Sequence, residues 1–199
     1  MRACFPALRS IMEILTTVLM SALWIVAPAH ADDKLWSELQ SGGLVLLMRH
    51  AATNPGVGDP PQFKLDDCST QRNLSAAGQM QATNIGRMLM AQGVTISAVL
   101  SSRWCRCLET ARRAFGKATP FPNLDSFFGD RSAQADAQTT AVRAKIQSFN
   151  GPGNLMMVTH QVNITALTGE YPAEGEIFVV RAGPQNRLQW IGRLPPVKP

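Results

Sequence analysis

Short continuous apolar runs at residues 43–48, 96–100 and 154–158 are the strongest local pattern in the sequence. Such runs are typical of strands that are buried on both faces, as in a parallel sheet. Each of the three ends in polar or charged residues. Two later segments, at residues 176–181 and 188–191, are predicted to be closing strands.

Helical spacing of apolar residues fills the intervals between these runs. Ser75 is suited to cap a helix that runs to about residue 92, where Gly93 stops it. Residues 104–115 and 133–149 predict two further helices, and a short helix follows the third apolar run. Helices therefore alternate with buried strands, which predicts a layered α/β domain.

Two segments do not fit either period. Residues 51–73 contain several prolines and glycines and are predicted to form a long loop, and residues 119–130 are rich in Pro and Phe and irregular. Long loops of this kind are often functional. We expect the choice of substrate to depend on residues 51–73 and 119–132, and Lys64 and Arg72 in the first of these are candidates for reaching a ligand.

The N-terminus has the pattern of a secretory signal. Residues 14–31 contain no Asp, Glu, Lys or Arg and end in the small-residue motif Ala-His-Ala. We expect residues 1–31 to be a signal peptide and residues 32–199 to be one domain, exported to the periplasm or secreted. The alternative is an uncleaved membrane anchor. After cleavage no stable membrane insertion is expected.

Charge and cysteine content narrow the function classes further. The chain of 199 residues carries a formal net charge of +5, spread without basic runs, which attracts small anions but does not favour nucleic acid. Three cysteines follow the predicted signal peptide: Cys68, Cys105 and Cys107. In an oxidising compartment we expect Cys68 to pair with one of the other two. Their spacing does not predict a metal site.

Candidate chemistry gathers where the predicted strands end. Arg49 and His50 end the first strand, residues 101–106 follow the second, and His160 ends the third. In α/β sheets the carboxyl ends of the strands carry the ligand site. A neutral imidazole is a competent nucleophile, and guanidinium groups match phosphate oxygens. The pattern favours phosphoryl transfer in which arginines, not a metal, stabilise the charge.

Four motifs in this order resemble those of the histidine phosphatase superfamily, in its phosphoglycerate mutase-like branch. Residues 46–53 (LLMRHAAT) resemble the R-H-G-x-T signature, and residues 74–82 (LSAAGQMQA) resemble an L-t-x-x-G-x-x-Q-A helix. Residues 101–111 (SSRWCRCLETA) resemble S-S-x-x-x-R-a-x-x-T-A, and residues 158–160 (VTH) resemble the motif of a second histidine. The resemblance implies the three-layer fold of that superfamily, with a mostly parallel central sheet flanked by helices.

The resemblance also implies roles for individual residues. His50 would accept the phosphoryl group, Arg49 and Arg106 would bind it, and His160 would be the second histidine of the pocket. Arg103 is the nearest rival of Arg106. Thr53 would lie near the bound substrate, or serve only as a turn residue.

The chain departs from the family pattern at two positions and leaves the proton donor open. Ala51 replaces the usual glycine after the first histidine, and Gln161 follows the second, where glycine or aspartate is common. The mutase-like branch takes its acid from the middle of the chain, for which Leu124-Asp125 is the best match. Asp125 is therefore the candidate proton donor. Its rivals are Asp59, Asp67, Asp130 and Glu176.

These observations predict an exported phosphomonoesterase that acts without a cofactor or metal on a small phosphorylated substrate. The alternative is a module of the same fold that binds phosphate or another anion without turnover. The sequence indicates no oligomeric state.

Overall fold

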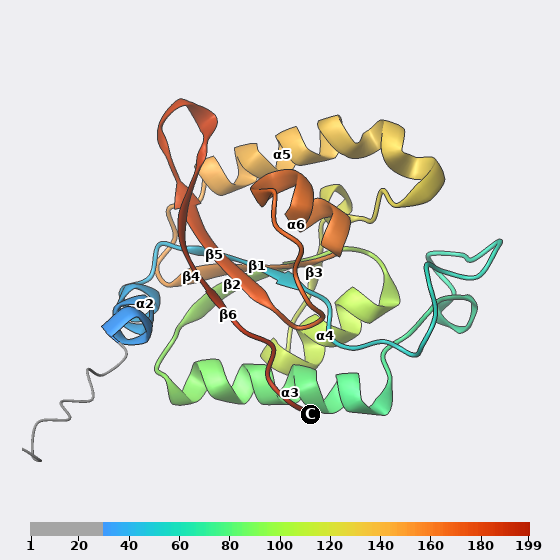
Figure 1. Cartoon of the computed structure of the whole chain (residues 1–199), viewed down its shortest axis with the longest axis horizontal. Coiled ribbons are helices and arrows are strands. Elements are labelled where there is room, and N and C mark those ends of the chain that lie inside the picture. Colours follow the sequence, from blue (N-terminus) through green and yellow to red (C-terminus); the bar gives the residue numbers. More distant parts are fainter. Residues whose placement is uncertain (1–29) are drawn as a thin grey trace, which may run out of the picture. The chain divides into compact units, whose positions relative to one another are not determined.

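The computed structural model describes residues 30–199, and one compact unit of it spans Asp33–Pro199 (Figure 1). The predicted signal peptide, residues 1–31, lies outside the described residues except for its last two. Those two begin helix α2 (His30–Ser41), an element that the sequence patterns did not predict. The predicted boundary at residue 32 stays a prediction.

A six-stranded sheet forms the middle layer, in the order β3-β2-β4-β1-β5-β6. Strands β3, β2, β4 and β1 run parallel to one another, whereas β5 is antiparallel to both β1 and β6. The sheet is therefore mostly parallel, as predicted. The strands span β1 (Val45–Arg49), β2 (Ile96–Ser101), β3 (Thr119–Pro120), β4 (Asn154–Thr159), β5 (Ile177–Ala182) and β6 (Leu188–Leu194).

Helices cover both faces of this sheet, because successive residues of each central strand point to opposite sides. Leu46 and Met48 of β1 pack with α2, α3 (Ala76–Ala91) and α4 (Cys105–Phe115). Val45 and Leu47 pack on the other face with α5 (Ala135–Gln147) and α6 (Gln161–Thr168). Figure 1 shows α3 and α4 on one side of the strands and α5 and α6 on the other. This is the predicted three-layer α/β fold.

The predicted helix ends agree with the structure where a capping residue marks them. The Ser75 hydroxyl accepts a hydrogen bond from the Gly78 amide at 3.0 Å, as an N-cap does. Gly116 ends α4 with a φ of +69°, a left-handed conformation that favours glycine. The predicted helix at 133–149 is shorter than expected, because its first turn belongs to a 3₁₀ segment, Gly129–Gln134.

The loop at residues 51–73 is anchored to α4 by a disulfide. Cys68, in a 3₁₀ turn (Cys68–Thr70), is bonded to Cys105 at the start of α4. This confirms the prediction that Cys68 pairs with one of the two later cysteines. Cys107 is a buried free thiol, and burial raises its pKa to about 12. It therefore stays protonated and is not a competing nucleophile.

Within residues 30–199, the helices include none that is both long and apolar enough to cross a membrane. The same residues contain no group of three or more His, Cys, Asp or Glu side chains arranged to hold a metal ion.

Candidate active site

The carboxyl ends of β1, β2 and β4 meet at one edge of the sheet, as their order in the sequence predicted. The His50 amide, just after β1, donates to the carbonyl of Thr159 at the end of β4, at 2.9 Å. The Ser102 amide, just after β2, donates to Val158 of β4 at 2.9 Å. The backbone of the sheet thus brings together the segments that carry Arg49, His50, Arg106 and His160.

His50 is held with one ring nitrogen committed to the backbone. Its side chain is buried, and its Nδ1 lies 2.9 Å from the carbonyl oxygen of Ala51, to which it donates in the tautomer protonated on Nδ1. That tautomer leaves a lone pair on Nε2. Burial and the positive charge of Arg106 lower the pKa of His50 well below its ordinary value, so the ring is neutral. Its Nε2 has the state that a nucleophile needs.

His160 faces His50 across the site, with 5.5 Å between the two ring centroids. Its Nε2 lies 2.8 Å from the Ser102 hydroxyl, and its Nδ1 lies 3.4 Å from Nη2 of Arg106. Because a guanidinium only donates, Nδ1 is the acceptor and Nε2–H donates to Ser102. Burial and Arg106 lower the pKa of His160 as well, so this ring is also neutral.

Arg106 lies deep in the site and is paired with a carboxylate of the loop. Its two terminal nitrogens contact the two Asp59 oxygens at 2.7 and 3.2 Å. The Asp59 carboxylate also accepts from Trp104 Nε1 at 2.9 Å and from the Arg72 amide at 3.1 Å. Burial by itself would raise the pKa of Asp59, but the hydrogen bonds and charge of Arg106 outweigh it and lower that pKa. Asp59 is therefore ionised.

Arg49 also lines the cavity and has one ionic partner. Its Nη1 donates to the carbonyl of Pro172 at 2.9 Å, and its Nη2 lies 3.7 Å from Glu174. Thr53 donates its hydroxyl proton to the same Glu174 carboxylate at 2.8 Å. Thr53 thus fixes the partner of Arg49 and does not itself line the cavity. The Nε atoms of Arg49 and Arg106 are buried without a hydrogen-bond partner.

Arg103, the rival of Arg106, is directed to a different partner. Its side chain is 47% exposed and lies 2.6 Å from the Asp125 carboxylate. That carboxylate also accepts from the Arg103 amide at 2.8 Å and from the Ser102 hydroxyl at 3.2 Å. Neither Arg103 nor Asp125 lines the cavity, whereas Arg106 does. Asp125 reaches the site only through the chain of bonds Asp125–Ser102–His160.

The other carboxylates considered from the sequence are spread over the fold. Asp67 caps the turn that carries Cys68, and its side chain accepts from the Ser69 amide at 3.0 Å. Glu176 accepts from the Ala173 amide at 2.8 Å behind β5. The side chain of Asp130 lies outside the described part of the chain. Among the residues that line the cavity, Asp59 is the one carboxylate that the structure describes.

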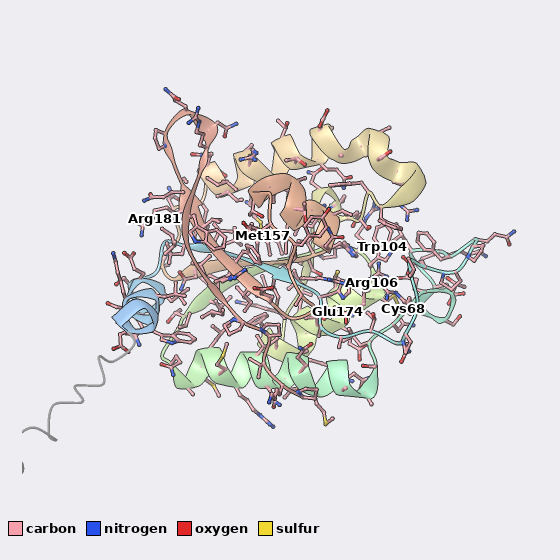
Figure 2. The ribbon with its side chains drawn as sticks, viewed as in Figure 1. Cys68, Trp104, Arg106, Met157, Glu174 and Arg181 are labelled. Atoms are coloured by element: carbon pink, nitrogen blue, oxygen red, sulfur yellow. A yellow bond between two sulfur atoms is a disulfide. The ribbon has the colours of Figure 1, made fainter. Side chains whose placement is uncertain are left out.

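A cavity of about 270 Å³ opens beside the two histidines. Arginines dominate its charged lining: Arg49, Arg72, Arg106 and Arg131. Figure 2 shows Arg106 and Trp104 at the end of the sheet that faces the loop with Cys68. The sequence patterns did not identify Asp59 as the partner of Arg106, and they missed Arg131. The available signal for Arg131 was its position within residues 119–132, which were expected to select substrate.

The two departures from the family pattern are accommodated locally. Ala51 is fully buried, and its amide donates to the Thr110 hydroxyl at 3.1 Å. Gln161 lines the cavity, and its side-chain amide donates to Thr165 one turn later in α6 at 3.0 Å. Neither Ala51 nor Gln161 has the positive φ that would favour the glycine of the family pattern.

Comparison with known proteins identifies the fold. No protein-family model and no curated protein sequence matches the chain. Solved structures do match it, each over most of both chains. The protein histidine phosphatase SixA in complex with tungstate is 19% identical and has a TM-score of 0.55, covering 77% of this chain and 97% of its own.

Two further structures are similar at the same level. A mycobacterial glucosyl-3-phosphoglycerate phosphatase is 16% identical, with a TM-score of 0.55 over 74% of this chain and 96% of its own. YhfR of Bacillus stearothermophilus is 16% identical, with a TM-score of 0.54 over 74% of this chain and 94% of its own. The chain therefore has the histidine phosphatase fold, as its four sequence motifs predicted.

Proposed function

We propose that this protein is an exported phosphomonoesterase that works through a phosphohistidine on His50. The observation that carries the proposal is a neutral histidine with a free Nε2 in a cavity lined by four arginines. The similar structures, which include proteins named as phosphatases, support the same class of activity. Export rests on the N-terminal sequence pattern, with which the disulfide is compatible.

The chemistry divides into two displacements at phosphorus. In the first, the lone pair of His50 Nε2 forms a bond to phosphorus while the bond to the leaving oxygen breaks, and that oxygen keeps the electron pair. In the second, a water oxygen forms a bond to phosphorus while the P–Nε2 bond breaks and its electron pair returns to Nε2; the proton that water loses balances the anion released in the first step. The sum is hydrolysis of one phosphate ester by one water molecule.

The arginines supply the charge stabilisation that this reaction needs. Arg49 and Arg106 line the cavity with His50 and are positively charged, so they match the oxygens of the transferred group in both displacements. Because these guanidinium groups fulfil the role that a divalent cation fulfils in many phosphatases, we propose that turnover is independent of metal.

Protonation of the leaving group sets a preference among substrates. Asp59 is ionised by its pairing with Arg106, so it is a poor proton donor. Asp125 is held by Arg103 and Ser102 and does not line the cavity. We propose that Asp125 positions His160 through Ser102 and that the enzyme favours esters whose leaving groups are stable as anions, such as aryl phosphates.

A non-catalytic anion-binding module is the second candidate, and one observation favours it. No carboxylic acid in its protonated form is available among the described residues of the cavity wall. Such a module would bind phosphate through Arg49 and Arg106 without forming a covalent bond to His50.

The test is hydrolysis of p-nitrophenyl phosphate by the purified protein in the presence of EDTA, beside His50→Ala. We expect turnover by the parent and none by the variant. Acid-labile phosphate on His50, trapped by rapid quenching, would identify the intermediate. Absence of turnover from pH 4 to 8, with phosphate binding retained in calorimetry, would instead support the binding module. Strong inhibition by EDTA would contradict the metal-free mechanism.

A further inference from the structure

We propose that the substrate carries a second anionic group, phosphate or carboxylate, besides the phosphoryl group transferred to His50. Arg72 and Arg131 would hold this second group at the mouth of the same cavity. The proposal rests on the proposed function only for the place of the transferred group. It assigns the substrate to the class of small molecules with two anionic groups.

The charge balance of the cavity wall is the first argument. Four arginines line the cavity, and Asp59 is fully engaged with Arg106. Arg49 has Glu174 at 3.7 Å. Among the side chains that the structure describes, no carboxylate lies within ion-pair distance of Arg72 or Arg131. A single phosphoryl group between Arg49 and Arg106 would leave Arg72 and Arg131 without an anionic group in direct contact, although Glu174 and Asp59 offset part of the charge of Arg72 from further away.

Arg72 is positioned as a binding group more than as a solvated surface residue. Its Nη1 donates to the carbonyl of Gly56 at 2.8 Å, which fixes the guanidinium within the loop. Its Nε is buried and has no hydrogen-bond partner. Burial and the neighbouring charge of Arg106 lower the pKa of Arg72 by more than the charges of Glu174 and Asp59 raise it, so this cation is held at a cost that a bound anion would offset.

Arg131 enters the cavity from the other irregular segment. Its Nε donates to the carbonyl of Ser126 at 3.2 Å, and its guanidinium carbon lies 4.8 Å from the ring centroid of Phe63 and 5.2 Å from that of Trp104. Stacking on two rings fixes the plane of a guanidinium and leaves its edge free to donate. Two preorganised cations from separate segments thus line the same cavity as Arg49 and Arg106.

The size of the cavity agrees with such a ligand. At about 270 Å³ it is close to the lower end of the roughly 300–1,000 Å³ that small-molecule sites occupy. There is room for more than a phosphoryl group, and for a compact molecule with two charged ends.

Binding measurements on the full-length purified protein test the proposal without requiring turnover. The probes are methylphosphonate, with one anionic group, and methylenediphosphonate and propane-1,3-diphosphonate, with two groups at different spacings. We expect at least one diphosphonate to bind ten times more tightly than methylphosphonate in calorimetry. Arg72→Gln and Arg131→Gln should each reduce that ratio several-fold, and Arg131→Lys should restore part of it.

Arg112→Gln is the matched control, because Arg112 is an exposed arginine on α4 that does not line the cavity. It should leave the ratio unchanged. Equal affinity of all three probes, or a ratio that survives both Gln variants in folded protein, would overturn the proposal. A high ratio without phosphohistidine formation would keep the two-anion site and refute the phosphatase. Phosphohistidine formation without a high ratio would keep the phosphatase and refute the two-anion site.

Discussion

The two histidines and the loop at residues 51–73 build the same cavity in different ways. His50 and His160 follow neighbouring strands, and backbone hydrogen bonds between β1 and β4 set their separation. The loop has almost no regular structure. It is held by the Cys68–Cys105 disulfide, by the Asp59–Arg106 pair, and by Gln71, which contacts the backbone of Lys64 at 2.8 Å and accepts from the Cys105 amide at 2.9 Å.

The difference teaches that the reacting atoms and the surrounding charge depend on separate parts of the fold. The nucleophile is carried by the scaffold that the core stabilises. Asp59 and Arg72 are carried by a segment whose position depends on a few side-chain links to α4. Substitutions that release the loop should therefore alter ligand binding while the strands stay intact.

The largest expected effect follows from removing the disulfide with Cys68→Ser and Cys105→Ser together. The bond spans a sequence separation of 37, and the chain-entropy model assigns a ring of this size a stabilisation of roughly 4 kcal/mol. We expect a loss of this order in the free energy of unfolding, measured with urea. Hydrogen exchange should show lost protection in residues 51–73 and retained protection in β1 and β4. Equal loss of protection in the loop and in the two strands would contradict the claim that they depend on separate parts of the fold.

Arg106→Ala is expected to lower kcat/KM for p-nitrophenyl phosphate roughly 150-fold, because the charge of the transition state loses a positioned donor. This corresponds to a loss of about 3 kcal/mol in transition-state stabilisation. Arg103→Ala provides the comparison, since Arg103 pairs with Asp125 outside the cavity. A larger effect at Arg103 would move the phosphate-binding role to that residue.

Gly78→Ala tests the close contact between α3 and the start of the loop at residues 51–73. A Cβ at Gly78 would lie 1.8 Å from the carbonyl oxygen of Ala52, two residues after His50, and backbone cannot move aside cheaply. We expect a loss of about 2 kcal/mol in the free energy of unfolding, the usual size for overpacking. Met80→Ala, at an exposed position of the same helix, should have little effect.

Acid should lower the free energy of unfolding gradually, through the two histidines that follow β1 and β4. The pKa of each histidine is lower in the folded protein than in the unfolded chain, so the unfolded chain binds more protons below its own pKa near 6.5. Stability should therefore fall as the pH drops below about 6.5, by at most about 1.4 kcal/mol per pH unit for each histidine. Urea unfolding at pH 7.5, 6.5 and 5.5 measures this slope, and His50→Gln should halve it. A flat profile would contradict the lowered pKa values.

Sequence patterns predicted the strand-end region well because its determinants are local. Apolar runs mark β1, β2 and β4, Ser75 and Gly116 mark helix ends, and the polar residues that follow each strand necessarily meet at one edge. The motifs singled out the two histidines and Arg106, which the structure brings together around one cavity.

The loop could not be predicted in the same way. Asp59 is one of several acidic residues in a polar segment, and nothing local marks it as the partner of Arg106. The two residues are 47 positions apart and meet only in the folded chain. Arg131 enters the cavity wall because it stacks on Phe63 and Trp104, which are distant in sequence. Likewise, the motif suggested Asp125 as an acid, but the structure shows that Asp125 forms an ion pair with Arg103.

A cavity that keeps two histidines uncharged, by burial first and by neighbouring arginines second, has an electrical potential that changes little with pH. Guanidinium groups do not lose their protons, and the imidazoles do not gain them, across the ordinary range of pH. The protonation of the incoming molecule then decides how strongly it is attracted. A phosphate group changes from one negative charge to two near pH 6. Such a site would discriminate among anions by the pKa of each anion, because the charge of the site itself does not change with pH.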